Sequence, residues 1–184
     1  MKRLASILAA LAAVIAVAHA ETEVVVSVPD QRLFLFQNGR RVASYPVSTS
    51  KFGIGSDARS YKTPLGTLAI TRKVGAGAPL GTVFKGLQRT GEILRPNAPG
   101  RDPIVTRIIC LDGTEPANSN AAARRIYIHG TPEERTIGRP ASYGCIRMKS
   151  HHVAHLFDHV SIGARVTVTP FSLSRVESGD FVQN

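Results

Sequence analysis

The stretch LFLFQNGRRVASYPVS, residues 33–48, carries the strongest structural signal in the sequence. It contains two runs rich in aromatic and branched apolar side chains, which meet at the dipeptide Asn38-Gly39. Asn and Gly tolerate the left-handed backbone conformation that a two-residue hairpin turn needs, so this dipeptide is a strong hairpin signal. The stretch therefore predicts two antiparallel strands joined by a tight turn.

Most other ordered segments also have the composition of strands. They are short, rich in Val, Ile and Thr, and bounded by Gly, Pro or Asp. The predicted strands are VVVSV (24–28), LGTLAITRKV (65–74), PIVTRIICL (103–111), RRIYIHG (124–130) and ARVTVTP (164–170). We therefore expect a mostly β fold.

The segments between the strands predict one helix and two long loops. Ser150 is in position to cap a helix that ends at Gly163, and apolar residues repeat inside it at helical spacing: Val153, Leu156, Phe157 and Val160. Residues 75–103 are rich in Gly and Pro and predict an irregular loop of the kind that often forms a functional lid. Residues 113–123 predict a second loop, with a helical turn possible through its alanines.

The first twenty residues have the features of a cleavable secretory signal peptide. Lys2 and Arg3 precede an apolar run, and Ala18-His19-Ala20 offers the small-x-small pattern of a cleavage site. A retained membrane anchor is the alternative, but the run is shorter than the roughly 20 apolar residues of a comfortable span. We expect export to the periplasm or cell wall, one domain over residues 21–170 and a C-terminal tail over 171–184.

The whole chain of 184 residues has a formal charge of +10. Removal of residues 1–20 leaves 21 basic and 13 acidic residues, a formal charge of +8. The basic residues are scattered and do not alternate with aromatic ones, which argues against nucleic acid as a partner. An exported protein of this charge suits the anionic polymers and lipid headgroups of a cell envelope.

The two cysteines occupy different local sequences. Cys110 closes an apolar strand and reads as a small buried hydrophobe, whereas Cys145 follows Ser-Tyr-Gly shortly after the tripeptide His129-Gly130-Thr131. A disulfide between them is compatible with export, although the two contexts favour a buried thiol and a nucleophile.

A nucleophilic cysteine needs a neighbouring base, and that base needs a group to hold its tautomer. His129 ends a predicted strand, and the carbonyl of Gly130 could orient its ring. Gly144 permits a tight turn in which the backbone N–H groups of residues 143–145 could converge on an oxyanion. Arg147 would lie on the same face as Cys145 in an extended chain. One His and one Cys remain weak evidence by themselves.

The string IHGTPEERTIGRPASYGCIRM, residues 128–148, resembles the active-site signature of the L,D-transpeptidase catalytic domain family, also called the YkuD type. That signature has His-Gly, a spacer containing Ile-Gly, then Ser-His-Gly-Cys, a hydrophobic residue, and Asn or Arg. The segment Thr63-Pro64-x-Gly66 resembles a second family motif, and the likeness covers roughly residues 24–170. It implies a curved mixed β-sheet or sandwich with one or two short helices, and a catalytic cysteine on a loop beside a cleft.

The resemblance also implies acyl transfer on peptidoglycan stem peptides. We expect a monomer that uses no cofactor or metal. Cys145 would attack the carbonyl of the third stem residue, a diamino acid, and expel the terminal D-alanine. His129 would serve as the base, held by the carbonyl of Gly130. Arg147 would bind a substrate carboxylate, and Ser142 would fix the loop. The acyl group would pass to an amine of another stem, to a wall-attached protein or to water.

One residue departs from the family signature, because Tyr143 replaces the His of Ser-His-Gly-Cys. The assigned base is a different residue, so the catalytic pair is retained, while the acceptor could differ. An L,D-carboxypeptidase or an amidase with the same Cys and His is therefore an alternative. A non-catalytic wall-binding module in which Cys145 is structural is a third possibility.

Two further groups of side chains invite a functional interpretation. His151, His155 and His159 have the i, i+4 spacing of a helical metal site and His152 lies beside them, but the better prediction is a solvated helix face. Glu133 and Glu134 could act as acid–base carboxylates, but their charged context favours a surface position.

Overall fold

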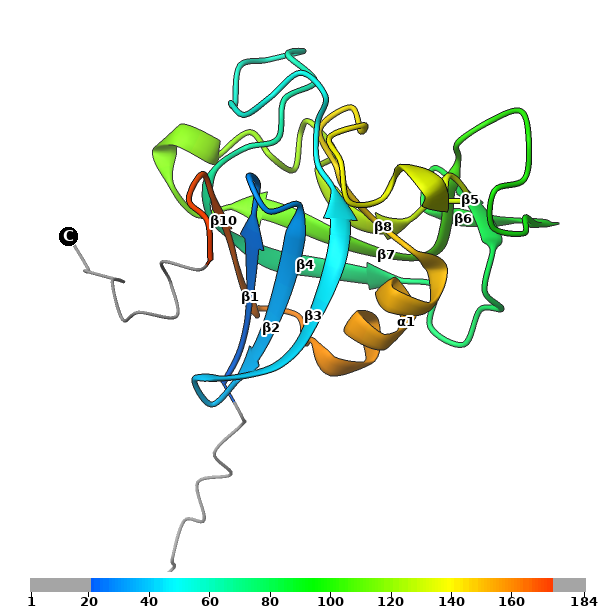
Figure 1. Cartoon of the computed structure of the whole chain (residues 1–184), viewed down its shortest axis with the longest axis horizontal. Coiled ribbons are helices and arrows are strands. Elements are labelled where there is room, and N and C mark those ends of the chain that lie inside the picture. Colours follow the sequence, from blue (N-terminus) through cyan, green and yellow to red (C-terminus); the bar gives the residue numbers. More distant parts are fainter. Residues whose placement is uncertain (1–20, 174–184) are drawn as a thin grey trace, which may run out of the picture.

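The computed structural model describes residues 21–173, which form a mixed β-sheet that closes on itself (Figure 1). The strands are β1 (Thr22–Ser27), β2 (Arg32–Gln37), β3 (Arg40–Ser48), β4 (Gly66–Val74), β5 (Thr82–Lys85), β6 (Gln88–Ile93), β7 (Ile104–Gly113), β8 (Tyr127–Gly130), β9 (Ile146–Met148) and β10 (Arg165–Thr169). The helices are two 3-10 turns, η1 (Pro116–Asn118) and η2 (Glu134–Thr136), and α1 (Ser150–His159).

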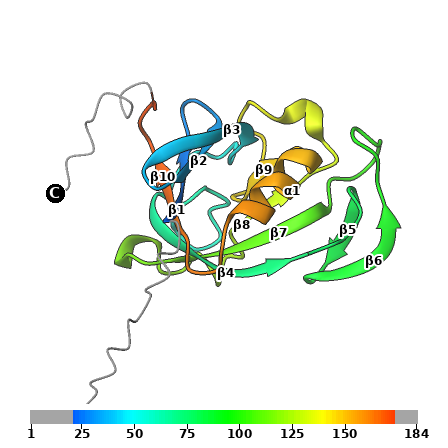
Figure 2. The ribbon, with the colours of Figure 1, turned by 90° about the horizontal axis from the view of Figure 1, so that it is seen from below.

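The strand order explains how the sheet closes. It runs β4-β10-β1-β2-β3-β9-β8-β7-β5-β6, and β4 pairs with both β10 and β7. The pairs β1–β10 and β8–β9 are parallel, and the others are antiparallel. The sheet is therefore mixed and strongly curved, and β5 and β6 extend it beyond the closed part (Figure 2). The predicted fold class is confirmed.

The core lies inside the closed sheet, as the alternation of strand side chains requires. Val24 and Val26 of β1 are fully buried in the main apolar cluster, whereas Val25 packs on the other face against Phe34 and Leu173. Leu173 also donates its N–H to Asp30 Oδ2 at 2.7 Å. Leu173, the third residue of the predicted tail, thus packs on the domain. Residues 174–184 and the predicted signal peptide lie outside the described residues.

The hairpin and the other predicted strands are confirmed within a few residues of their predicted limits. At the turn between β2 and β3, Asn38 and Gly39 have φ of 50° and 72°. Both central residues are left-handed, which is the geometry that a two-residue turn of the primed type demands.

The prediction of an irregular loop over 75–103 is wrong, because β5 and β6 form a hairpin within it that pairs with β7. The turn is made by Gly86 and Leu87, with φ of 57° and 67°. Leucine is not a residue type that predicts a turn, so the sequence does not reveal this one. The strand β6 is exposed along nearly all its length, so its sequence lacks the alternation of apolar and polar residues that predicts a strand. The three-residue strand β9 is likewise too short for a periodic signal.

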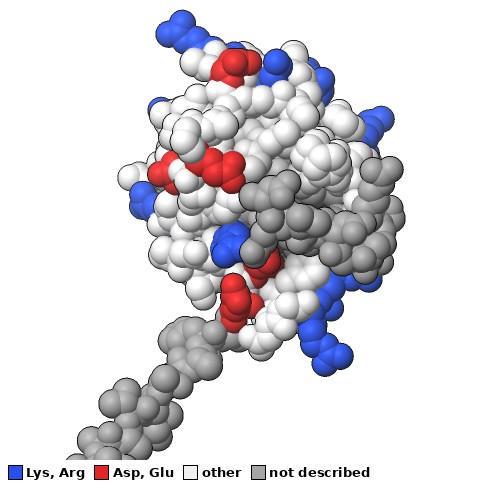
Figure 3. Space-filling model, turned by 90° about the vertical axis from the view of Figure 1, so that its left-hand side faces the viewer, with Lys and Arg blue, Asp and Glu red and all other residues white. Residues whose placement is uncertain are grey.

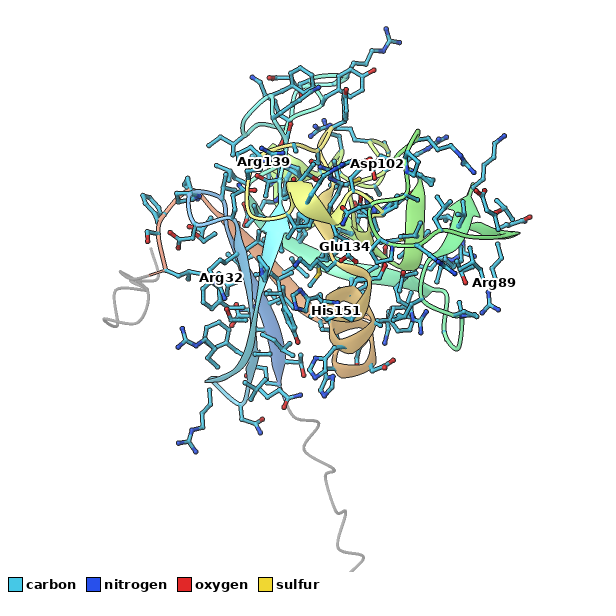
Figure 4. The ribbon with its side chains drawn as sticks, turned by 45° about the vertical axis from the view of Figure 1, so that its right-hand side comes forward. Arg32, Arg89, Asp102, Glu134, Arg139 and His151 are labelled. Atoms are coloured by element: carbon cyan, nitrogen blue, oxygen red, sulfur yellow. The ribbon has the colours of Figure 1, made fainter. Side chains whose placement is uncertain are left out.

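The helix α1 is confirmed, but both predicted ends shift. Ser150 is the first helical residue and does not act as the N-cap. Its backbone N–H donates to Glu134 Oε1 at 2.8 Å, so a carboxylate distant in the sequence accepts a hydrogen bond from the first turn of the helix (Figure 4). The helix ends at His159, before Gly163, because Val160 is already extended. Its buried face packs against β7 and β8: Val153, Leu156 and Phe157.

Charge is distributed without one dominant patch on the face shown in Figure 3, where Lys and Arg project around the edge and Asp and Glu lie among them. Within the described residues, no helix has the length and apolar character needed to cross a membrane.

Candidate active site

The strands β8 and β9 bring His129 and Cys145 to neighbouring positions. The two strands are parallel, with His129 opposite Arg147, and Cys145 immediately precedes β9. Directly paired residues of adjacent strands share a face, so His129 and Arg147 project to the same side. Cys145 lies one residue before β9, and the charge of Arg147 acts on its thiol. Ile128 and Ile146 point the other way and are fully buried in the core, which fixes the orientation of both strands.

The His129 ring is held in one orientation. It is 6% exposed, and its Nδ1 lies 2.9 Å from the carbonyl oxygen of Gly130. A carbonyl can only accept, so Nδ1 donates and Nε2 keeps its lone pair. Burial lowers the pKa of His129, opposed by this hydrogen bond and by the charge of Asp102, while Arg147 lowers it further. A neutral imidazole at pH 7 is the form that a general base requires.

Gly130 has no room for a side chain. A Cβ there would lie 2.5 Å from the carbonyl oxygen of Val105 on the adjacent strand β7. The strand is bulged between Val105 and Ile108, and Thr106 has a φ of 71° inside the bulge. The close approach of these backbones explains the glycine that follows His129.

Cys145 is partly exposed as a residue, and its thiol is hydrogen-bonded to backbone. Its Sγ lies 3.3 Å from the carbonyl oxygen of Arg125. Burial raises its pKa to about 11, against the lowering effects of a backbone hydrogen bond from Tyr127 and of the nearby charges of Arg124 and Arg147. The resting sulfur is therefore a thiol at neutral pH, and a nucleophilic role needs a base to take its proton.

Ser142 and Thr63 hold the loop that leads into Cys145. Ser142 Oγ donates to the carbonyl of Cys145 at 2.6 Å and accepts from the N–H of Gly144 at 3.2 Å. Thr63 Oγ1 donates to the carbonyl of Gly144 at 3.0 Å. Gly144 has a φ of 117°, which explains the glycine before the cysteine. Its N–H is engaged, so the N–H groups of Tyr143 and Cys145 are the remaining oxyanion candidates in that loop.

Arg147 is 6% exposed and bound by protein groups. Its guanidinium forms an ion pair with Asp102 and lies 3.0 Å from Thr136 Oγ1 and 3.3 Å from Ser48 Oγ. Asp102 also accepts from the hydroxyl of Thr131. In this arrangement Arg147 supplies positive charge near Cys145, and a substrate carboxylate would have to compete with Asp102 for it.

Sequence reasoning missed Asp102 and Arg124. Asp102 lies in the segment before β7, which carries no catalytic pattern (Figure 4). Arg124 precedes β8 and donates to the carbonyls of Gly55 and Lys62, which holds the loop over residues 49–65 against the site. No sequence motif around either residue predicts its role, because each contacts residues more than 20 positions away in the sequence.

A groove of about 330 Å³ adjoins the cysteine. It shares Arg125 and Tyr127 with the hydrogen-bonding surroundings of Cys145, and Ile108 pairs with His129 in the sheet. Its lining residues are Phe84, Gly86, Leu87, Ile104, Ile108, Arg125 and Tyr127. The β5–β6 hairpin forms one wall, so part of the region predicted as a lid lies beside the candidate nucleophile.

Tyr143 faces solvent. It is 62% exposed, and its hydroxyl lies 2.9 Å from Lys51 Nζ. Its ring contacts Phe52 and Tyr61 from the loop between β3 and β4. Both cysteines are free thiols, so the alternative of a Cys110–Cys145 disulfide is not realised in this structure.

Several of the remaining candidate side chains have structural partners. Among residues 21–173, no group of three or more His, Cys, Asp or Glu side chains is arranged to hold a metal. The His155 ring lies 2.6 Å from the Tyr45 hydroxyl through Nδ1, and it stacks on His159 with centroids 4.2 Å apart. Glu133 pairs with Arg135, and Glu134 accepts from the first N–H of α1.

Comparison with known proteins gives consistent matches. A putative L,D-transpeptidase YkuD of Bacillus licheniformis is 26% identical over 148 residues, 80% of this chain and 65% of its own length. A putative L,D-transpeptidase YqjB of Bacillus subtilis is 50% identical over 46 residues, 24% of this chain and 26% of its own. The chain thus spans less than two thirds of these relatives.

The fold has solved counterparts. L,D-transpeptidase 3 of Mycobacterium tuberculosis, in complex with a faropenem-derived adduct, superposes with a TM-score of 0.53 at 16% identity, over 82% of this chain and 60% of its own. Residues 21–168 match the profile of the L,D-transpeptidase catalytic domain. The chain therefore belongs to the L,D-transpeptidase catalytic domain family.

Proposed function

We propose that the protein is a cysteine L,D-transpeptidase that acts on peptidoglycan stem peptides. The observation that carries this proposal is the parallel pairing of β8 with β9, because His129 lies on β8 and Cys145 immediately precedes β9. The His129 tautomer is fixed by the carbonyl of Gly130. Membership of the family and the faropenem-derived adduct on a structural relative support acyl transfer.

The first half-reaction forms a thioester on Cys145. His129 Nε2 takes the thiol proton as sulfur attacks the carbonyl carbon of the third stem residue. The peptide C–N bond then breaks, and the departing amine of D-alanine takes the proton from His129. The high pKa of the resting thiol means that proton transfer accompanies the attack.

The second half-reaction transfers the acyl group. An acceptor amine attacks the thioester carbon, loses a proton to His129, and displaces sulfur, which regains the proton. The N–H groups of Tyr143 and Cys145 would stabilise the oxyanion in both halves. Water in place of the amine would give the carboxypeptidase reaction at the same residues.

The groove beside Cys145 is the proposed site of the donor peptide. Its walls are apolar apart from Arg125, which is exposed and whose carbonyl contacts the thiol. Arg125 is therefore better placed than the paired Arg147 to bind a carboxylate of the diamino acid. Peptidoglycan lies outside the cytoplasm, so the proposal requires the export predicted from residues 1–20.

Product analysis tests the proposal. The protein comprising residues 21–184 is incubated with a disaccharide tetrapeptide, and the products are identified by mass spectrometry. A cross-linked dimer with released D-alanine supports transpeptidation, whereas a tripeptide alone identifies a carboxypeptidase. Cys145→Ala should give neither, and Cys110→Ala should behave as the wild type. An unchanged substrate with folded wild-type protein would contradict the proposal.

A further inference from the structure

Three exposed aromatic rings gather next to the candidate nucleophile. Phe52, Tyr61 and Tyr143 are 46%, 58% and 62% exposed. Their ring centroids lie 5.6 Å apart for Phe52–Tyr143 and 6.0 Å apart for the other two pairs. We call these three residues the aromatic platform. Tyr143 is two residues from Cys145, so the platform adjoins the reacting sulfur.

The platform contains most of the exposed aromatic side chains among residues 21–173. The chain has no Trp, four Tyr and seven Phe. Among the described residues, the exposed large aromatic side chains are the three of the platform and Phe171. Clustered exposed apolar rings cost hydration free energy and commonly mark a binding surface. Phe171 lies after β10, and within residues 21–173 its ring contacts no other aromatic ring, so it provides an exposed ring for comparison.

The backbone holds the platform rigidly against the loop of Cys145. Ser50 pairs with Ser142 in an isolated parallel bridge, and the N–H of Lys51 donates to Ser142 at 3.1 Å. Ser50 Oγ donates to the carbonyl of Tyr61. Tyr61 has a φ of 57°, a strained conformation for a bulky residue that persists only where the surroundings impose it. Figure 1 shows this β3–β4 loop rising beside the loop before β9.

A cation lies on the platform. Lys51 Nζ is 4.3 Å from the centroid of Tyr143 and 5.3 Å from that of Phe52, and it donates to the Tyr143 hydroxyl. The same loop carries Arg59 and Lys62 against a single acidic residue, Asp57. This positive charge disfavours an ammonium-bearing acceptor on the platform and suits a neutral or anionic ligand with hydrogen-bond acceptors.

We propose that the aromatic platform binds the amino-sugar glycan strand to which the stem peptide is attached. This inference rests on the proposed function. Pyranose rings present C–H faces that stack on exposed aromatic rings, and sugar hydroxyl and acetamido oxygens can accept from Lys51 and Tyr143. The groove adjoins Cys145 through Arg125 and Tyr127, whereas the platform adjoins it through residues 142–144. Peptide and glycan would thus occupy different surfaces that meet at the sulfur.

Matched substrates with and without sugar test the inference. Phe52→Ala, Tyr61→Ala and the double variant are compared with the wild type and with Phe171→Ala as the exposed-ring control. For a disaccharide tetrapeptide, kcat/KM should fall about fivefold for each single variant and more than about tenfold for the double variant. For the same tetrapeptide without sugar, and for Phe171→Ala on either substrate, kcat/KM should stay within about twofold. Equal losses on both substrates, or no loss on either, would overturn the inference.

A binding measurement separates this inference from the proposed function. Calorimetry or NMR titration with a soluble oligosaccharide of N-acetylglucosamine uses Cys145→Ala with and without the two platform substitutions, so no turnover is required. Saccharide binding that is lost with the platform supports the inference even where the wild type shows no turnover. Absence of saccharide binding, or binding only of an apolar peptide to the platform, would refute it.

Discussion

The two cysteines share a face of the sheet and differ in their neighbours. Cys110 pairs with Tyr127 across β7 and β8, and the backbone N–H of Tyr127 also reaches Cys145, so the thiols flank one residue. Burial raises the pKa of both thiols. Cys110 is 7% exposed among apolar side chains such as Ile108 and Phe84. Cys145 ends a loop next to His129 and is partly exposed.

Burial therefore does not distinguish a nucleophile from a structural thiol in this molecule. The surroundings of Cys145 differ from those of Cys110 in four features that suit a nucleophile. They are a base with a fixed tautomer, a glycine-containing turn, a neighbouring cation and access to a groove. The comparison makes Cys110 a natural control for each experiment on Cys145.

The largest expected effect comes from removing each thiol in turn. Cys145→Ala should lower kcat/KM on a disaccharide tetrapeptide by more than about 10³-fold, because no other group can carry the acyl intermediate. Cys110→Ala should stay within about threefold and lower the free energy of unfolding by about 1 kcal/mol through lost packing. Comparable losses of activity in two folded variants would remove the distinction between the cysteines.

A methyl group at Gly130 should disturb the base without touching either cysteine. In Gly130→Ala the new Cβ would lie 2.5 Å from the Val105 carbonyl, so the backbone beside His129 must shift. A displacement approaching 1 Å predicts a fall in kcat on the order of 10²-fold. Gly130 has no positive φ, so its substitution tests the steric contact alone. Gly77→Ala, at a φ of 66° and with nothing within 4 Å of the added atom, is the comparison variant with backbone strain but no such contact. Full activity in Gly130→Ala would show that the position of His129 is unimportant.

The pH dependence of alkylation should separate the thiols next. Cys145 has a pKa of about 11, so its thiolate fraction rises about tenfold per pH unit between pH 7 and 9. Iodoacetamide should label Cys145 with that slope and leave Cys110 unlabelled in the folded protein, as measured by peptide mass spectrometry. A rate at Cys145 that is flat across this range would instead indicate a resting thiolate paired with a protonated His129.

The smallest expected effect concerns Asp102. In Asp102→Asn the buried Arg147 loses its carboxylate partner, and we expect a loss of about 2 kcal/mol in the free energy of unfolding. The charge of Asp102 raises the pKa of His129, so its removal should move the acidic limb of the pH–kcat/KM profile to lower pH. Glu92→Gln, which breaks an exposed pair with Arg101, should cost less than about 0.5 kcal/mol. An unmoved acidic limb would exclude a role for Asp102 in tuning the base.

The sequence predicted those parts of the fold that depend on local patterns. Asn38-Gly39 determined the first hairpin, and alternating apolar residues located the long strands. The β5–β6 hairpin escaped prediction because its turn uses Leu87 at a positive φ and its outer strand is almost wholly exposed. The start of α1 was misassigned because its partner is Glu134, sixteen residues away.

The candidate site shows the same division between local and distant determinants. The thiol, the imidazole and the glycines of the candidate site could be predicted from the sequence, because all of them lie in the single segment 128–148. Asp102 and Arg124 act from other elements on Arg147 and on the loop over 49–65, which only the folded chain brings together. The sequence also did not predict the surroundings of Tyr143, whose ring contacts Phe52 and Tyr61 at the surface.

Acylation of the thiol by a β-lactam tests the central claim most directly. Faropenem is chosen because L,D-transpeptidase 3 of Mycobacterium tuberculosis was solved with a faropenem-derived adduct. Intact-mass measurement should find one adduct on the wild type and on Cys110→Ala, mapped by peptide sequencing to Cys145, and none on Cys145→Ala. An adduct that persists on Cys145→Ala, or a folded wild type that acquires none, would contradict the assignment of Cys145 as the acylated nucleophile.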